Sequence, residues 1–170
     1  MYWAWAERAV SRSAPPRWLV PILLAWLAAC SGDARSPETQ IRRLIGELAE
    51  AVEQGSIGQA AAWLDTDYRD QFHPDKRSAV STLFGHMRRH RKIHLFVRIN
   101  DLQVIEPQGQ ARAVVQVAMT GKPVDSVESL IALKADLYRF EVRFTRNREQ
   151  GAWQIASSRW KRADLASLLP

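Results

Sequence analysis

Three histidines lie four residues apart in the basic stretch HMRRHRKIH, at His86, His90 and His94. On one continuous helix they would share a face, and imidazoles at this spacing can bind zinc. The residues that follow alternate between apolar and polar, which predicts a strand, so we expect His94 to lie beyond the end of the helix. Arg89 and Arg91 would also repel a divalent cation. We therefore expect no metal and no cofactor here, and a solvated basic helix end instead.

Asp65, Asp67 and Asp70 of the segment DTDYRD form a second cluster that could bind a cation. A calcium loop of the EF-hand type also needs a glycine turn and a distal glutamate that binds with both oxygens. Neither is correctly placed in this segment. Charge clusters that lack the full ligand pattern are usually surface, so the segment indicates the solvated end of a helix.

Cys30 is the only cysteine of the chain, so it cannot form an internal disulfide. Three arginines and then an apolar block over residues 18–29 lie ahead of it, which is the outline of an export signal. The block is shorter than the about 20 residues that a membrane-spanning helix needs. We therefore expect the signal to be cleaved.

The residues Leu27-Ala28-Ala29-Cys30 resemble the lipobox of bacterial lipoproteins. This resemblance implies that Cys30 carries fatty acyl chains such as palmitate and becomes the first residue of the mature protein. Each buried acyl CH₂ contributes about 0.8 kcal/mol, so more than one chain holds a protein durably on a membrane. The serine that follows the cysteine, in place of aspartate, implies the outer membrane and its periplasmic side. The alternatives are an ordinary signal peptide with a coincidental cysteine and a core thiol.

These patterns divide the chain into a signal peptide over residues 1–29, a flexible tether over 30–36 and one domain over 37–170. The whole chain carries a formal net charge of +6 and stays positive without the signal. An exported protein meets anionic lipid headgroups and other envelope polyanions, so we expect no nucleic-acid partner. The residues expected to form a basic patch for an anionic envelope surface or an acidic protein are Arg88, Arg89, Arg91, Lys92, Lys161 and Arg162.

Helical periodicity covers the first part of the domain. A first helix begins at Pro37, after the N-cap candidate Ser36, and carries apolar residues at helical spacing. A second helix begins after Ser56 and is expected to continue to Phe72, and a third begins at about Asp75 and runs into the basic stretch.

From Ile93 onward the apolar residues alternate with a period of two, which predicts strands. At residues 100–101 the alternation slips by one position, as it does at a β-bulge. Residues 106–110 predict a turn and residues 113–119 a second strand, whereas the passage 124–135 fits either a short helix or a strand.

The clearest strand alternates over residues 136–147, and a hairpin joins it to a last strand over 153–160 in which a further slip precedes Trp160. Helices followed by a strongly bent antiparallel sheet make an α+β fold in which the sheet wraps around the helices.

The opening segment IRRLIGELAEAVEQGSIGQAAAWLDTDYRD and the closing segment YRFEVRFTRNREQGAWQIASSRWKR resemble the NTF2-like (SnoaL-like) superfamily. Its members open with a long helix, continue with an acidic D-x-D-Y type segment and finish on paired strands with a G-x-W-x-I turn. The resemblance covers nearly all of residues 37–165 and implies a cone, in which helices pack on a strongly bent antiparallel sheet. Related sheets often dimerise, so it also allows a homodimer.

The NTF2-like cone usually encloses a pocket, and its enzymes place carboxylates or a histidine on the inner face. No acid or base interrupts the strand face that we expect to point inward, so the sequence predicts no catalytic residue. The residues expected to line the pocket are Tyr68, Met119, Tyr138, Phe140, Phe144 and Trp153. If the space is filled instead, Met119, Phe140, Phe144 and Trp153 pack against Leu44, Leu48 and Leu83.

The sequence thus predicts a lipid-anchored, periplasm-facing NTF2-like domain that acts as a non-enzymatic binding or interaction module. One alternative is an enzyme of the isomerase or cyclase type that uses the cone pocket, and another is a carrier of a small apolar ligand. An acid or histidine inside the cone would favour the enzyme, and a deep open pocket would favour the carrier.

Overall fold

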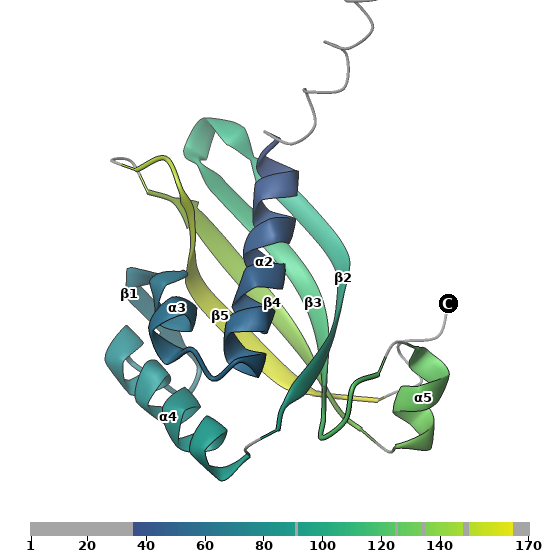
Figure 1. Ribbon diagram of the computed structural model, residues 1–170. Helices are drawn as coiled ribbons and strands as arrows, with labels where there is room; N and C mark the ends of the chain where they lie inside the picture. Colours follow the sequence, from purple (N-terminus) through teal and green to yellow (C-terminus); the bar gives the residue numbers. More distant parts are fainter. Residues whose placement is uncertain (1–35, 91, 125, 134, 148–149, 165–170) are drawn as a thin grey trace, which may run out of the picture. The chain divides into compact units, whose positions relative to one another are not determined.

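The computed structural model describes residues 36–90, 92–124, 126–133, 135–147 and 150–164 (Figure 1). The expected signal peptide, Cys30 and the tether up to residue 35 lie outside the described residues. The helices are α2 (Pro37–Glu53), α3 (Ile57–Ala62), α4 (Lys76–Arg89) and α5 (Val127–Ala132), with a short 3₁₀ turn η2 (Glu106–Gln108). The strands are β1 (Leu64–Asp70), β2 (His94–Ile105), β3 (Gln110–Thr120), β4 (Asp136–Arg146) and β5 (Trp153–Ala163). None of these helices is long and apolar enough to span a membrane.

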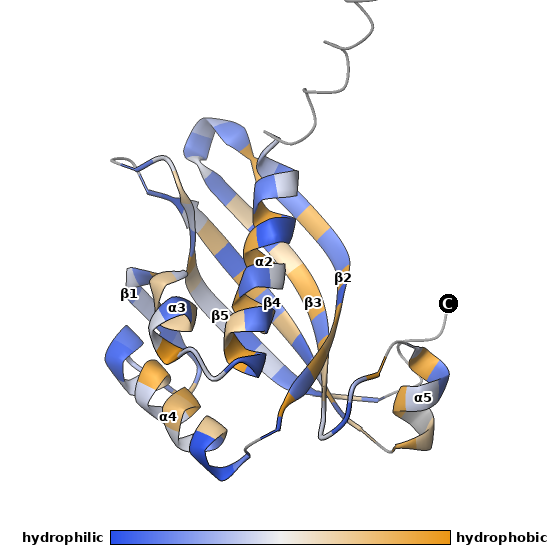
Figure 2. Ribbon diagram, in the orientation of Figure 1, coloured by the Kyte–Doolittle hydropathy of each residue, from blue (hydrophilic) through white to orange (hydrophobic). Residues whose placement is uncertain are grey.

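α2 begins where the sequence predicts and covers one face of the sheet. The Ser36 hydroxyl accepts a hydrogen bond of 3.2 Å from the backbone N–H of Thr39, and Pro37 occupies the first turn. Ile41 and Leu44 of its apolar stripe are buried in the core. In Figure 2 hydrophobic and hydrophilic residues alternate along α2, as expected for a helix with one face on a sheet.

The segment after α3 differs from the sequence prediction. The second helix is short, and Leu64–Asp70 forms strand β1 rather than a solvated helix end. β1 pairs in parallel with β5, with Leu64 opposite Ile155 and Asp70 opposite Ser158. The prediction was wrong because the partner that holds β1 lies at the far end of the chain, where no local pattern reveals it.

The five strands form one sheet in the order β1-β5-β4-β3-β2. Neighbouring strands from β2 to β5 are antiparallel, and β1 makes the sheet mixed. The expected α+β fold with helices on a bent sheet is therefore correct, and the expectation of a wholly antiparallel sheet is corrected at the β1 edge.

Both expected slips of the alternation are present as irregularities in strand pairing. One residue is inserted in β2 between Ile99 and Asp101, opposite β3. The pairing of β4 with β5 shifts next to Phe144, so that Phe140 lies opposite Trp160. An inserted residue turns the side chains beyond it to the other face. The second slip therefore brings Trp160 to the same face as Phe140.

The two faces of the sheet carry separate cores. The inward face packs on α2, with a buried cluster made of Ile41, Leu44, Ile45, Tyr68, Ala111, Ala113, Val115, Val142, Phe144, Trp153 and Ile155. On the outward face α5 covers one end of the strands, where Leu130 packs with Ala118 and Leu137 (Figure 1). The passage that the sequence left unassigned is therefore the helix that covers part of the outer face.

α4 begins close to the expected position and is capped by Asp75, whose carboxylate accepts a hydrogen bond of 2.7 Å from the Ser78 N–H. The helix ends at Arg89, and His94 begins β2, which confirms that the three histidines do not share one helix. α4 packs on β1 and α3. No residue of α4 is buried, so this helix covers its part of the sheet only loosely.

Candidate binding site in the open half of the cone

The inward face of the sheet is divided into a covered half and an open half. The half under α2 consists of buried side chains: Ala111, Ala113, Val115, Val142, Phe144, Trp153 and Ile155. The half on the side of α4 consists of partly exposed side chains: Val117, Met119, Tyr138, Phe140 and Trp160. We call this second set the open half of the cone.

An aromatic cluster centred on Trp160 dominates the open half. The Tyr138 ring meets the Trp160 ring edge-on, with centroids 5.6 Å apart, and Phe140 lies 6.1 Å away on the neighbouring strand. Phe72, from the loop after β1, lies 4.9 Å from Trp160 and is 61% exposed. Such ring pairs stabilise one another by about 0.5 to 1.5 kcal/mol beyond area burial, so the cluster is a preformed aromatic surface.

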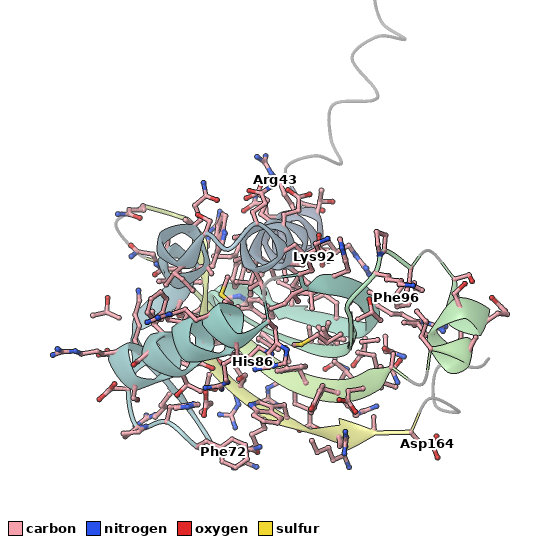
Figure 3. All side chains as sticks on the ribbon, turned by 60° about the horizontal axis from the view of Figure 1, so that its bottom comes forward. Arg43, Phe72, His86, Lys92, Phe96 and Asp164 are labelled. Atoms are coloured by element: carbon pink, nitrogen blue, oxygen red, sulfur yellow. The ribbon has the colours of Figure 1, made fainter. Side chains whose placement is uncertain are left out.

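His86 of α4 points from the helix toward the strands (Figure 3). Its Nε2 lies 3.2 Å from Sδ of Met119, and its ring stacks on His90 with centroids 4.5 Å apart. Burial lowers the pKa of His86, and the nearby charges of His90 and Arg89 lower it further. His86 is therefore a neutral imidazole at pH 7 and adds a polar group to the open half.

A polar network closes the β1 end of the inward face. The Tyr68 hydroxyl donates to Oδ2 of Asp70 at 3.1 Å and lies 2.9 Å from the Ser158 hydroxyl of β5. Oδ1 of Asp70 also accepts the backbone N–H groups of Phe72 and His73. The network thus joins strand β1, its partner β5 and the loop that leads to α4.

The His73 ring completes this network. Its Nδ1 lies 2.9 Å from each carboxylate oxygen of Asp70, and its Nε2 lies 2.9 Å from the Thr82 hydroxyl of α4. Burial opposes ionisation of Asp70, but the hydrogen bonds from His73, Phe72 and Tyr68 outweigh it and lower the pKa of Asp70.

Burial is also the main cause that raises the pKa of Tyr68 to about 12, which keeps its hydroxyl protonated. The expectation that no ionisable group interrupts the inward face was therefore wrong for β1. Asp70 lies opposite Ser158 on that face, and the local sequence does not reveal this position because its pattern predicts a helix there.

The predicted pocket residues fall into three groups. Tyr138, Phe140 and Met119 lie in the open half, whereas the Tyr68 ring is buried and only its hydroxyl reaches the polar network. The remaining two, Phe144 and Trp153, are 2% and 3% exposed and pack in the core with Leu44 and Leu48. These two side chains therefore lie in the core, with two of the three leucines expected if the space is filled, while Leu83 is not part of that cluster. Trp160, Phe72 and His86 were missed, although the predicted slip could have identified Trp160.

The structure describes the residues of the predicted basic patch except Arg91, and two of them point in opposite directions. Arg88 and Arg89 are exposed at the end of α4, where the Arg88 guanidinium lies 5.7 Å from the Phe84 ring centre, and Arg91 lies outside the described residues. Lys161 and Arg162 are neighbours on β5, so their side chains point to opposite faces of the sheet.

Arg162 also forms an ion pair with Asp136. This pair offsets the positive charge that Arg162 would contribute to the predicted patch. Lys92 is exposed in the connection to β2. Within the described part of the chain no three acidic, histidine or cysteine side chains are grouped so that they could hold a metal ion.

No family profile and no curated protein matches the chain. Solved structures do resemble it. A protein described as a candidate scytalone dehydratase from Novosphingobium aromaticivorans shares 12% identity at a TM-score of 0.56, over 85% of this chain and 89% of that one. An NTF2-like protein from Cytophaga hutchinsonii shares 12% identity at a TM-score of 0.53, over 75% of this chain and 99% of that one.

Bd1075 from Bdellovibrio bacteriovorus is also similar, with 10% identity and a TM-score of 0.55 over 73% of this chain. This chain spans only 40% of the length of Bd1075. At such low identities the similarities define the fold and not the activity. The domain is an α+β cone with the NTF2-like fold.

Proposed function

We propose that this protein is a lipid-anchored binding protein of the bacterial envelope, whose NTF2-like domain takes a small ligand with an apolar, aromatic body into the open half of the cone. The observation that carries the proposal is the Trp160 cluster. Its rings stay partly exposed on the inward face, next to a helix that buries none of its own residues. Concave sites lined by aromatic side chains with a few polar groups are the usual form of small-molecule sites.

The anchoring part of the proposal depends on Cys30. The basic and apolar residues ahead of it and the Leu27-Ala28-Ala29-Cys30 pattern support cleavage, acylation and attachment to the periplasmic side of the outer membrane. Intact-mass measurement of the native product should find a chain that starts at an acylated Cys30. The Cys30→Ser variant should leave the membrane fraction, and an unmodified thiol in the native protein would contradict the anchoring.

The state of the polar network favours binding over catalysis. A general base needs a lone pair that is free to reach the substrate. The Asp70 carboxylate already accepts from Tyr68, His73 and two backbone groups, and its low pKa makes it a weak base. Both ring nitrogens of His73 are also engaged. This network therefore holds the β1 end of the cone together and leaves ligand contacts to the open half.

Binding can be tested with the fluorescent probe 8-anilinonaphthalene-1-sulfonate and the purified full chain. We expect saturable binding that quenches tryptophan emission, and a loss of affinity of about tenfold or more in Trp160→Ala, since aromatic anchors carry much of the energy of such contacts. Leu133→Ala is the control, because Leu133 is 48% exposed directly after α5, the helix on the outward face. Equal affinity of both variants and the wild type would contradict the proposed site.

A second candidate function, an enzyme of the isomerase, cyclase or dehydratase type, is favoured by His86. Its imidazole is half-buried in the open half and neutral at pH 7, as a general base must be. Two of the similar structures are described as candidate dehydratases. If a ligand recovered with the native protein were chemically converted by the wild type but not by His86→Gln, the enzyme would replace the binding protein.

A further inference from the structure

The outward face of the sheet, beyond the end that α5 covers, carries a groove of about 570 Å³. It crosses the strands from β1 to β2, and its lining residues include Arg69, Arg112, Arg143 and Arg159 from four different strands. The carboxylates of Asp101 and Glu141 also lie in it. Each strand contributes only one or two of these six residues, so the sequence of a single strand does not reveal the cluster.

Strand pairing arranges the charges of the groove in two rows that run across the sheet, and a third row lies next to them, outside the groove. The first row consists of Gln103, Arg112, Arg143, Ser157 and Arg69. The second row consists of Asp101, Val114, Glu141 and Arg159. The third row consists of Arg98, Gln116, Arg139 and Lys161. The first and third rows are therefore basic, and the row between them contains two acidic residues and one arginine.

Two pairs of like charge lie directly opposite each other in the basic rows. Arg112 faces Arg143 between β3 and β4, and Arg139 faces Lys161 between β4 and β5. Directly opposed like charges destabilise a sheet, since their Cβ atoms are only about 5 Å apart. Among the described residues, no ion pair or side-chain hydrogen bond compensates Arg112 or Arg143. An anionic partner would remove this cost.

The spacing of the rows defines the partner more closely. Successive rows are two residues apart along β3, β4 and β5, which corresponds to about 7 Å, and three apart in β2 at the bulge. In an extended peptide that runs along the strands, side chains on one face repeat at the same distance. Acidic side chains at two such positions would reach the two basic rows, and a basic or neutral side chain between them would lie over Asp101 and Glu141. Arginine suits this role because its guanidinium binds a carboxylate with two parallel hydrogen bonds.

We infer that the outward face of the sheet is a docking surface for an extended acidic segment of a partner protein, with acidic residues on either side of a basic or neutral one. A membrane of anionic lipids fits less well, because the central carboxylates of Asp101 and Glu141 would face its phosphates. A second copy of this chain fits less well too, because two such faces would oppose arginine to arginine.

The test measures binding of synthetic peptides to the full chain by fluorescence anisotropy. One nine-residue peptide has glutamate at its third and seventh positions and lysine at the fifth, and a second has the same composition with the glutamates adjacent. We expect the first peptide to bind at least about tenfold more tightly, with an affinity that falls as salt is raised. Equal binding of the two peptides, or none, would overturn the inference.

The variants separate this surface from general electrostatics. In Arg112→Glu/Arg143→Glu we expect a loss of about tenfold or more for the first peptide. The control is Arg42→Glu/Arg77→Glu, which makes the same charge change at exposed helix positions and should bind normally. Thermal unfolding of each variant establishes that it folds, and the single variant Arg143→Gln replaces the pair if it does not.

Two further measurements decide between partners. Vesicles of phosphatidylglycerol that bind more tightly than the peptide, and lose binding in Arg112→Glu/Arg143→Glu, would overturn the inference in favour of a membrane. A dimer seen by sedimentation that dissociates in the same variant would overturn it in favour of a second copy. Each result is independent of ligand binding at Trp160, since the two sites occupy opposite faces of the sheet.

Discussion

The hydroxyl groups of Tyr68 and Ser158 lie 2.9 Å apart and join the edge strand β1 to β5 on the inward face of the sheet. Tyr68 gives its only hydroxyl proton to Asp70, so Ser158 is the donor in the bond between the two hydroxyls. The pair is buried, and Ser158 is 9% exposed. It therefore holds in place a strand that the local sequence does not favour.

Tyr68→Phe should destabilise the domain by about 1 to 3 kcal/mol, because the buried Ser158 hydroxyl loses its acceptor and Asp70 loses a donor. Urea unfolding followed by circular dichroism measures this change. Tyr138→Phe is the matched control, since Tyr138 is only half-buried, and it should change stability by less than about 0.5 kcal/mol. Equal effects of the two variants would show that the hydroxyl network contributes nothing to stability.

Asp70→Asn should cost about 1.5 to 3 kcal/mol at pH 7, because the carboxylate is the shared acceptor for His73, Tyr68 and two backbone groups. Since folding lowers the pKa of Asp70, its contribution is present above the pKa of the unfolded chain, about 3.9, and is lost as the pH falls through the lower folded value. Wild-type stability should therefore fall more steeply below pH 4 than that of Asp70→Asn. Parallel pH profiles of the two proteins would contradict this assignment.

Much of the fold could be predicted from periodicity. The Ser36 and Asp75 caps, the end of α4 before His94 and both slips of the strands are local signals, and the structure contains each of them. β1 could not be predicted, because it forms only against β5, and its short segment follows a helical pattern without a break. For the same reason, the parallel pairing of β1 with β5 at the edge of the sheet could not be predicted.

The candidate binding site could also be predicted only in part from local patterns. The alternation of β4 predicted Tyr138 and Phe140 correctly as inward residues, but it could not tell them from Phe144, which α2 covers. Coverage depends on how helices lie over the sheet, and periodicity within one strand does not contain that information. The basic row that contains Arg112 and Arg143 could not be predicted either, because it forms only when the strands pair.

Two glycines should respond to alanine in opposite directions. Gly109 ends the η2 turn with φ +58°, and an added Cβ would lie 3.4 Å from Cβ of Arg146, so Gly109→Ala should destabilise by about 1 to 2 kcal/mol. Gly46 lies exposed inside α2 with nothing near its would-be Cβ, so Gly46→Ala should stabilise by about 0.5 to 1 kcal/mol. Thermal unfolding of the two variants measures the direction of each change in stability. A gain in stability for Gly109→Ala would contradict the left-handed backbone conformation at Gly109.

The titration of His86 tests how the open half of the cone is built. Burial against Met119 and the charges of His90 and Arg89 lower its pKa, so the ring should titrate below about 6.5 in an NMR experiment. The unfolded chain then binds the proton more readily than the folded one, so stability falls as the pH drops through this range, and His86→Gln should remove that part of the fall. Arg89→Ala should raise the pKa of His86, because one repelling charge is gone, while Arg77→Ala at the other end of α4 should leave it unchanged. A normal pKa in the wild type would mean that water surrounds the ring and that His86 is not buried against Met119.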